Sequence, residues 1–342
     1  MKVGLVLGKF YPLHKGHLGL IRFASSHCDL LYVLVCASDK EEISGTIRLS
    51  WIKEALENEF FEDNQVMPEV VPILLNYSEQ DLPNTSVSSK KVANIWASKI
   101  KALLDRIDVV FTSEKYGDYL AKYLKCRHIM FDALREKFPV SASGIRKDPF
   151  SHWDYIVSTA RSYFVKKVAI LGTESTGKST LAQSLAAHFK TSFVSEVGRQ
   201  VVPQTEVCTI ENLYEIAVSH AENIQQKTKD ANKIIIVDTD LTITRSYAHF
   251  LFEHELKVEA WVEQSNHFDL YLYLEADAPF IQDGTRLNEA ERNLLDQSHK
   301  MMLDKYNIGY ESISGSWKVR FQKAVELIER KFEIIKKPTR IE

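Results

Sequence analysis

The sequence predicts an α/β protein built from two tandem doubly wound parallel-sheet domains. Two successive series of short apolar runs alternate with longer segments of helical periodicity, which is the pattern of βαβ units. The apolar runs are continuous rather than alternating with polar residues, as expected for strands buried on both faces. The chain has 342 residues, of which 45% are hydrophobic and 26% charged, which is enough for about two globular domains.

The first series predicts a domain over residues 1–150. Its expected strands are apolar runs such as "KVGLVLG" and "DLLYVLVCAS", at 2–8, 29–38, 70–75, 108–114 and 128–133. Its expected helices lie at 17–27, 46–59, 89–105 and 116–124. A linking helix is expected over 151–165, where the stretch "DPFSHWDYIVSTARSYF" precedes the next strand.

The second series predicts a domain over residues 166–342. Its expected strands lie at 166–172, 192–196, 233–240 and 269–275, with a last one near 310–314. Its expected helices lie at 178–189, about 209–230, 243–264, 289–304 and 317–335. Because strands and helices alternate here as well, a second parallel sheet is expected.

Composition limits the classes of function. The net charge of −3 predicts no general affinity for nucleic acid, so any anion site is local. The N-terminal run "VGLVL" is about half a signal-peptide core, and no window approaches about 18 uninterrupted apolar residues, so membrane insertion is not expected. The four cysteines form no CxxC pair and predict reduced thiols in a cytoplasmic protein: Cys28, Cys36, Cys126 and Cys208.

The stretch "GTESTGKST" fits the phosphate-loop pattern G-x-x-x-x-G-K-[ST], between an expected strand and an expected helix. Glycines let successive backbone N–H groups face the phosphates of ATP. Lys178 reaches the β and γ phosphates, and the Ser179 hydroxyl is a ligand for Mg²⁺. The expected ATP-binding residues are Gly172, Thr173, Glu174, Ser175, Thr176, Gly177, Lys178, Ser179 and Thr180.

Two strand ends supply candidate acids for this domain. The run "IIIVDTD" ends in Asp238 and Asp240, either of which suits the Mg²⁺ shell. Asp238 is assigned to the metal and Asp240 to catalysis, and the alternative is an acid in a strand-end turn. The run "SFVSEVGR" ends in Glu196 and Arg199. In small-molecule kinases with this core, that position faces the phosphoryl acceptor, so Glu196 is expected to be catalytic and both residues to bind a riboside. A structural Glu–Arg pair is the alternative.

The segment "DGTRLNEAER" follows the fourth strand of the second domain. At this place P-loop kinases carry a lid whose arginines reach the transferring phosphoryl group. The resemblance makes Arg286 the first candidate, as a catalytic and ATP-binding residue, and Arg292 the second, for ATP. An exposed, charged start of a helix is the alternative.

The stretch "GKFYPLHKGH", after the first strand, holds two histidines and two lysines and no acid. A zinc or hydrolase site usually includes thiolates or carboxylates, so the stretch is expected to hold an anion. It resembles the H-x-G-H signature of the nucleotidyltransferase superfamily, in which both histidines bind ATP and stabilise the leaving pyrophosphate. A second signature, "VSASGIR", resembles the superfamily's I-S-[SA]-T-x-I-R motif, with Ser143 in place of Thr.

The two signatures imply the residues of the adenylyltransferase site. The resemblance assigns catalysis to His14, His17 and Arg146. It assigns ATP binding to these three and to Gly8, Lys9, Phe10, Ser141 and Ser143.

The form of the first signature resembles that of nicotinamide mononucleotide (NMN) adenylyltransferases of archaeal and NadR type. Lys9 stands where phosphopantetheine adenylyltransferases commonly have Thr or Ser. Asn84 and Trp96 match an Asn and a Trp of that subgroup, in which the Trp stacks on the nicotinamide ring. The segment "SGTIRLSWI" adds Arg48 as a candidate contact to NMN. Trp96 as an ordinary core residue is the alternative.

The order of the domains resembles NadR-type bifunctional proteins, which join NMN adenylyltransferase to ribosylnicotinamide kinase. The resemblance implies phosphorylation of nicotinamide riboside by ATP, followed by adenylylation of NMN to give NAD and pyrophosphate, with Mg²⁺ in both steps. A homo-oligomer and coupling to a riboside transporter are compatible with this role. The first signature starts at residue 8, so the helix-turn-helix domain of some members, and a role as a repressor, are not expected.

Two other functions fit parts of the pattern. A fusion of phosphopantetheine adenylyltransferase with dephospho-CoA kinase would have the same domain order. Lys9, Asn84 and Trp96 speak against this alternative. A regulatory protein that senses NAD or ATP, with one weak active site, is the second alternative, and the intact Lys178 and Ser179 speak against it.

Overall fold

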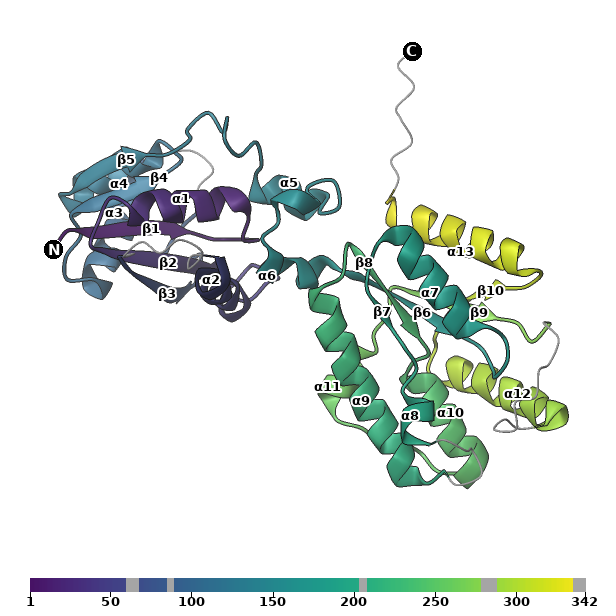
Figure 1. The fold of residues 1–342 in the computed structure, drawn as a ribbon. Coiled ribbons are helices and arrows are strands. Elements are labelled where there is room, and N and C mark those ends of the chain that lie inside the picture. The colour runs from purple at the N-terminus through teal and green to yellow at the C-terminus, as the bar shows by residue number, and fades with distance from the viewer. Residues whose placement is uncertain (60–67, 85–88, 203–207, 278–287, 335–342) are drawn as a thin grey trace, which may run out of the picture. The chain divides into compact units, whose positions relative to one another are not determined.

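The computed structural model describes residues 1–59, 68–84, 89–202, 208–277 and 288–334. The chain divides into two compact units, with the boundary between Tyr163 and Phe164 (Figure 1). Each unit is an α/β layer structure around one parallel sheet, which confirms the predicted fold class.

The sheet of the first unit has five parallel strands in the order β3-β2-β1-β4-β5. The strands are β1 (Val3–Gly8), β2 (Leu30–Ser38), β3 (Glu69–Tyr77), β4 (Val109–Thr112) and β5 (Arg127–Met130). The helices are α1 (Lys15–Ser25), α2 (Gly45–Glu59), α3 (Lys90–Leu103), α4 (Tyr116–Leu124) and α5 (Ala142–Lys147). Because β1 lies between β2 and β4, the chain leaves the sheet in opposite directions there, and a ligand crevice forms at such a point.

Packing explains why these segments form the predicted elements. Leu5 and Val6 of β1 are fully buried, as continuous apolar strands require. On α1, Leu18, Ile21 and Ala24 recur at helical spacing and are buried. The carboxyl end of β1 and the amino end of α1 are therefore held rigidly on either side of the first signature.

The sheet of the second unit also has five parallel strands, in the order β10-β9-β6-β8-β7. The strands are β6 (Lys166–Leu171), β7 (Phe193–Val194), β8 (Ile234–Asp238), β9 (Leu270–Leu274) and β10 (Glu311–Ile313). The helices are α7 (Lys178–Phe189), α8 (Gly198–Val201), α9 (Ile210–Lys229), α10 (Leu241–Phe252), α11 (Ala260–Ser265), α12 (Glu289–Lys305) and α13 (Trp317–Phe332). Strand β6 lies between β8 and β9, so the phosphate loop follows the central strand.

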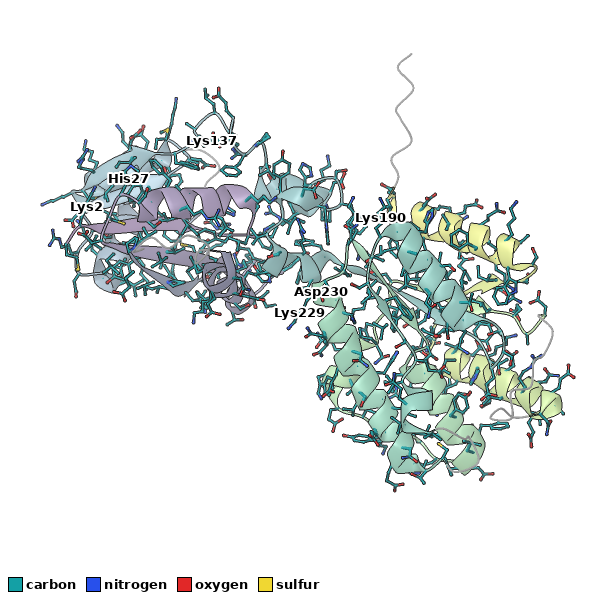
Figure 2. All side chains as sticks on the ribbon, viewed as in Figure 1. Lys2, His27, Lys137, Lys190, Lys229 and Asp230 are labelled. Atoms are coloured by element: carbon teal, nitrogen blue, oxygen red, sulfur yellow. The ribbon has the colours of Figure 1, made fainter. Side chains whose placement is uncertain are left out.

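Charged side chains cover the ends of the outer helices. Lys190 follows α7, and Lys229 and Asp230 lie at the end of α9, where all three are exposed (Figure 2). No helix of the described residues combines the length and the apolar character that crossing a membrane requires.

The helix predicted over 243–264 is wrong as a single element. Helix α10 ends at Phe252 because Glu253 takes a left-handed conformation, with φ of 51°. The chain then turns inward, and Leu256 is buried before α11 begins at Ala260. Burial of this leucine by tertiary packing ends a periodic pattern that local sequence would continue.

The segment 151–165 forms three short helical turns instead of one helix: Trp153–Tyr155, α6 (Ser158–Arg161) and Ser162–Phe164. Ile156 is extended and forms an antiparallel bridge with His14. The backbone N–H of Val157 donates to the carbonyl of Leu13. Pairing with the first signature loop therefore interrupts the helix.

We expect Glu253→Gly to stabilise the second unit by up to about 1 kcal/mol, because glycine adopts positive φ without the cost a side chain imposes. Urea unfolding followed by far-UV circular dichroism measures the change. Glu253→Val is the matched control and should destabilise the unit, since a β-branched residue is disfavoured at this φ. Equal stabilities of the two variants would contradict the assigned helix end.

Candidate active sites

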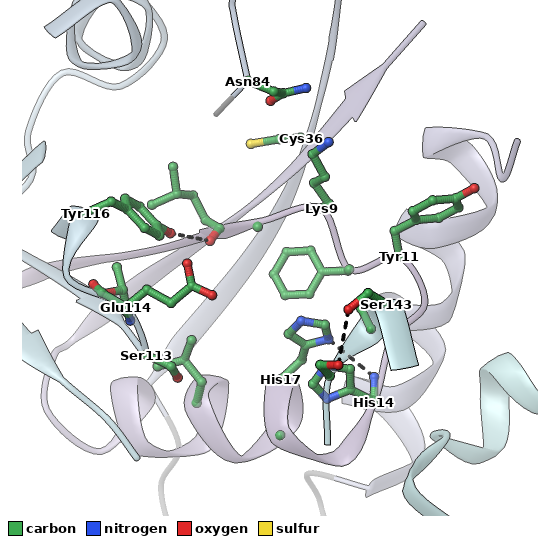
Figure 3. A pocket seen from close by; sticks show the side chains of 18 of the residues that line it. Lys9, Tyr11, His14, His17, Cys36, Asn84, Ser113, Glu114, Tyr116 and Ser143 are labelled. Carbon is green, nitrogen blue, oxygen red and sulfur yellow. Dashed lines mark hydrogen bonds between the residues drawn. The ribbon is translucent and has the colours of Figure 1, made fainter. Parts of the chain in front are cut away.

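A cavity of about 500 Å³ opens at the carboxyl ends of the strands in the first unit (Figure 3). The loop from β1 to α1, the residues after β4 and the start of α5 all contribute to its walls. This is the crevice that the strand order predicts. The expected residues that line it are Gly8, Lys9, Phe10, His14, His17, Asn84, Trp96, Ser141, Ser143 and Arg146.

The two signature histidines form one stacked pair. Their ring centroids lie 3.6 Å apart with an interplanar angle of 23° (Figure 3). His14 is the N-cap residue of α1, and its backbone N–H donates to Nδ1 of His17 at 3.3 Å. A backbone N–H can only donate, so this Nδ1 accepts and the ring proton of a neutral His17 lies on Nε2.

Both imidazoles are neutral at pH 7. Burial, with a smaller effect of Arg135, lowers the pKa of His14 to about 4. Burial, His14 and Arg135 together hold the pKa of His17 well below its usual value. The pair therefore offers neutral N–H donors, and the positive charge on the cavity wall comes from basic side chains such as Arg146 and Arg135.

Lys9 and Arg48 share one carboxylate. The Nζ of Lys9 lies 2.8 Å from Glu41 Oε1, and Nη2 of Arg48 lies 2.7 Å from Glu41 Oε2. Arg48 is fully buried and donates from Nη1 to the carbonyl of Lys9 at 2.8 Å. Unlike the other residues expected to bind NMN, Arg48 does not line the cavity. It supports the signature loop from behind.

The second signature closes the same cavity. Ser141 caps α5 by accepting from the Gly144 N–H at 3.1 Å, and its hydroxyl lies 3.2 Å from that of Ser143. Arg146 donates to the carbonyl of Tyr11, and its guanidinium lies 4.4 Å from the centroid of the Tyr11 ring. The two signatures, far apart in the chain, are thus joined directly.

Asn84, in the segment after β3, and Trp96, on α3, line the cavity. The Asn84 amide accepts from the Tyr77 hydroxyl at 2.8 Å and donates to Glu79 at 2.7 Å. The indole N–H of Trp96 donates to the carbonyl of Pro83 at 3.2 Å, and its ring packs edge-on against Tyr77. Both side chains are therefore held in place, and Asn84 lies away from the histidine pair (Figure 3).

Sequence reasoning missed several cavity residues. Tyr11 lies inside the first signature, and Glu114 follows β4, where a strand-end acid is a usable signal. Arg135 shows no local pattern that marks it, although its guanidinium lies 3.5 Å from Glu114. Its approach to the histidines depends on how the loop after β5 folds back.

In the second unit, the phosphate loop joins β6 to α7. Gly172 and Gly177 have φ of 137° and 86°, which favour glycine. A Cβ atom on Gly172 would lie 2.6 Å from the carbonyl oxygen of Leu274. The Lys178 ammonium and the Thr176 hydroxyl both donate to the carbonyl of Thr173, at 3.0 and 2.8 Å. The loop therefore has the curled form that the motif predicts.

The side chain of Ser179, on α7, meets that of Asp238 at the end of β8. The Ser179 hydroxyl donates to Asp238 Oδ2 at 2.5 Å, and Asp238 is fully buried. Hydroxyl and carboxylate oxygens are hard donors of the type that Mg²⁺ prefers. Among the described residues there is no group of three or more His, Cys, Asp or Glu that could hold a metal ion without help from a substrate.

Asp240 has a structural explanation. It is the N-cap residue of α10, and its carboxylate accepts from the Ile243 N–H at 2.9 Å. Burial raises its pKa to about 6. Asp240 therefore lies in the turn between β8 and α10 and caps the helix. This position agrees with the alternative interpretation, in which Asp240 is an acid in a strand-end turn.

The other predicted kinase residues are only partly described. Glu196 follows β7 and is half-buried. The side chain of Arg199 and the whole of Arg286 lie outside the described residues. Arg292 is 3% exposed, and its Nη2 donates to the carbonyl of Ala276 at 3.3 Å. Arg292 is therefore buried, whereas the alternative interpretation of this segment is an exposed, charged start of a helix.

Arg320 contacts the phosphate loop from α13, and no pattern in the sequence indicates this contact. It is 1% exposed and donates to the carbonyls of Thr176 at 2.7 Å and Glu275 at 3.1 Å, and it pairs with Asp277. It approaches from α13, 144 residues after Thr176, so no motif connects the two.

Comparisons with known proteins agree with this arrangement. Residues 167–320 match a family described as "AAA domain". The chain is 29% identical to the trifunctional NAD biosynthesis/regulator protein NadR of Escherichia coli, over 95% of this chain and 82% of that protein. Crystal structures of a NadR protein with NR, and with NAD and AMP-PNP, superpose with TM-scores of 0.75 and 0.76 at 21% identity, covering 98% of this chain and 97% of each neighbour. The expected resemblance to NadR-type proteins is confirmed over both units.

Acid should destabilise the protein in a defined range. Burial lowers the pKa of His14 and His220 to about 4 and of His299 to about 3 in the folded state. In the unfolded chain the histidine pKa is near 6.5, so between about pH 6.5 and pH 4 the unfolded state binds more protons than the folded state. The stability that these three histidines contribute is therefore complete above about pH 6.5 and is lost as the pH falls towards 4. This loss outweighs the smaller opposite contribution of Asp240, whose pKa is raised to about 6.

Urea unfolding at pH 7, 6 and 5 tests this expectation. His299→Gln, which removes one of the three groups, should reduce the decline in the second unit, whereas His27→Gln, at an exposed position, should not. The same free energy of unfolding at pH 7 and 5 would contradict the buried neutral histidines.

Proposed function

We propose that the protein converts nicotinamide riboside to NAD in two steps that use ATP. The second unit phosphorylates the 5′-hydroxyl of the riboside to give NMN. The first unit then transfers the adenylyl group of a second ATP to NMN and releases pyrophosphate. The observation that carries the proposal is that two nucleotidyltransferase signatures meet in one cavity of a chain whose other unit holds a phosphate loop. Similarity to NadR over both units supports it.

The adenylyl transfer needs no general base. A phosphate oxygen of NMN attacks the α-phosphorus of ATP, and the bond from that phosphorus to the bridging oxygen of pyrophosphate breaks. The nucleophile is already an anion, so catalysis consists of alignment and charge stabilisation. His17 donates from Nε2 to a phosphate oxygen, with His14 stacked against it. Arg146 and Lys9 contribute positive charge to the triphosphate.

The neutral state of the histidines suits this role. A neutral donor hydrogen-bonds to oxygen in both the substrate and the pyrophosphate product, and it gains strength as negative charge develops. Stacking at 3.6 Å disfavours charging both rings in the free enzyme, as the low pKa values indicate.

NMN occupies the part of the cavity beside α3. Trp96, held by its bond to Pro83, stacks on the cationic nicotinamide ring. Asn84, fixed by Tyr77 and Glu79, offers its remaining hydrogen-bonding capacity to the carboxamide.

In the kinase step, the acceptor hydroxyl oxygen forms a bond to the γ-phosphorus and the bond to the ADP oxygen breaks. Lys178 and the loop N–H groups hold the β and γ phosphates. Glu196, at the end of β7, orients the acceptor and takes its proton. Arg286 remains our candidate for the arginine that reaches the transferring group. Ser179 and Asp238 would hold Mg²⁺, which would supply charge neutralisation there.

Variants of the two sites should separate the steps. With nicotinamide riboside and Mg·ATP, His17→Ala should make NMN but little NAD, whereas Lys178→Ala should make neither product and still convert added NMN to NAD. Each loss should be about 10²–10³-fold, as for removal of one donor to a developing charge. Chromatography of labelled riboside, NMN and NAD measures both.

The surface histidine His27 provides the control, and His27→Ala should leave both steps unchanged. NAD formation by His17→Ala at the normal rate would overturn the site. Turnover of 4′-phosphopantetheine in place of NMN would instead favour the coenzyme A alternative.

Ser179→Ala should raise the Mg²⁺ concentration needed for half-maximal kinase activity, because one oxygen near the metal is lost. The adenylyl step with added NMN should keep its Mg²⁺ dependence, which serves as an internal control. Titration of each step with MgCl₂ measures the difference. A parallel change in both steps would argue against a metal site at Ser179.

A further inference from the structure

Trp317, the first residue of α13, has no role in the mechanism above and is unusually exposed. The protein has five tryptophans, and Trp51 and Trp153 are only 5% and 4% exposed. Trp96 is half-buried, and Trp261 is 36% exposed. Trp317 is 53% exposed, the highest value of the five, so a large apolar surface faces solvent next to a functional loop.

The indole of Trp317 packs directly on the phosphate loop. A Cβ atom on Gly177 would lie 1.7 Å from Cη2 and 2.2 Å from Cζ3 of this indole, so only glycine leaves room for the ring. Gly177 is the N-cap residue of α7 and immediately precedes Lys178. The edge of the six-membered ring therefore touches the backbone that curls around the phosphates.

The ring is also held in place. The guanidinium carbon of Arg320 lies 5.5 Å from the indole centroid, within the range of a cation–π contact. Arg320 is itself fixed by its bonds to the carbonyls of Thr176 and Gly315, at 2.7 and 2.8 Å. The same arginine thus fixes the phosphate loop and the turn before Trp317, which preorganises the exposed part of the indole.

We propose that the exposed surface of Trp317 stacks on the purine base of the nucleotide whose phosphates lie in Gly172–Thr180. The inference rests on the proposed kinase function of the second unit and adds to it the platform for the base. A nucleotide anchored by its phosphates places its base within reach of the loop's border. There, a preorganised aromatic ring gains apolar burial and stacking at little entropic cost.

Stacking on Trp317 should increase the affinity of the second unit for purine nucleotides but should discriminate little between adenine and guanine. An indole face stacks on any base, because stacking does not read the hydrogen-bonding edge. We therefore expect Trp317 to strengthen ATP and GTP binding to similar degrees and to leave inorganic tripolyphosphate, which has no base, unaffected.

Steady-state kinetics of the full-length protein provide the first test. Trp317→Ala should raise the KM for ATP in the kinase step about tenfold to a hundredfold, by loss of one stacked base, with a smaller change in kcat. Trp317→Phe, which keeps an aromatic ring, should show a smaller rise. Trp261→Ala, at the next most exposed tryptophan, is the matched control and should leave the KM unchanged.

Tryptophan fluorescence tests binding without relying on turnover. In a Trp96→Phe background, which silences the indole of the first cavity, ADP should quench emission and tripolyphosphate should not. The additional change Trp317→Phe should abolish the quench. Because this readout needs no riboside, it separates failure of the stacking proposal from failure of the proposed kinase substrate.

Two results would overturn the proposal. One is an unchanged KM for ATP in Trp317→Ala, together with an unchanged quench by ADP when Trp317→Phe is added to the Trp96→Phe background. The other is equal weakening of ATP and tripolyphosphate, which would place the effect on the shape of the phosphate loop rather than on the base. Circular dichroism would show that each variant is folded, and the variants that keep Trp96 should also retain NAD formation from NMN.

Discussion

Both units are built around one arrangement, a loop between a central parallel strand and the helix that follows it, where free backbone N–H groups favour an anion. In the first unit this loop runs from β1 to α1 and carries the histidine pair. In the second unit it runs from β6 to α7 and carries Lys178. A helix N-terminus presents free N–H groups to an anion, and a parallel sheet aims this terminus at the edge where ligands bind. The two candidate sites thus share the same backbone geometry.

Each loop is supported from behind by a buried arginine. Arg48 donates to the carbonyl of Lys9, and Arg320 donates to the carbonyl of Thr176. Both are at most 1% exposed, and each has an acidic partner, Glu41 or Asp277. Glu41 is 7% exposed, so removing one member of the buried Arg48–Glu41 pair should cost about 3–5 kcal/mol. Asp277 is 40% exposed, so its pairing with Arg320 contributes less. Each loop is thereby preorganised.

The distribution of charge distinguishes the two sites. In the first, burial keeps His14 and His17 neutral, so fixed donors are combined with cations placed around the cavity wall. In the second, the Lys178 ammonium donates to the carbonyl of Thr173 within the phosphate loop, and a buried carboxylate, Asp238, lies beside Ser179. The first arrangement suits transfer between two anionic phosphates, whereas the second suits a metal-assisted transfer to a neutral hydroxyl.

The sequence by itself determined the fold class, both parallel sheets and the position of the two signatures and the phosphate loop, because each of these depends on residues close together in the chain. Tertiary structure decided the rest. Helix α10 ends at Phe252, and the chain then turns so that Leu256 packs into the core. Arg48 lies behind its loop rather than in the cavity, Asp240 caps a helix, and Arg320 contacts a loop 144 residues away. Local periodicity and spacing carry no information about such contacts, since they form only when distant segments pack together.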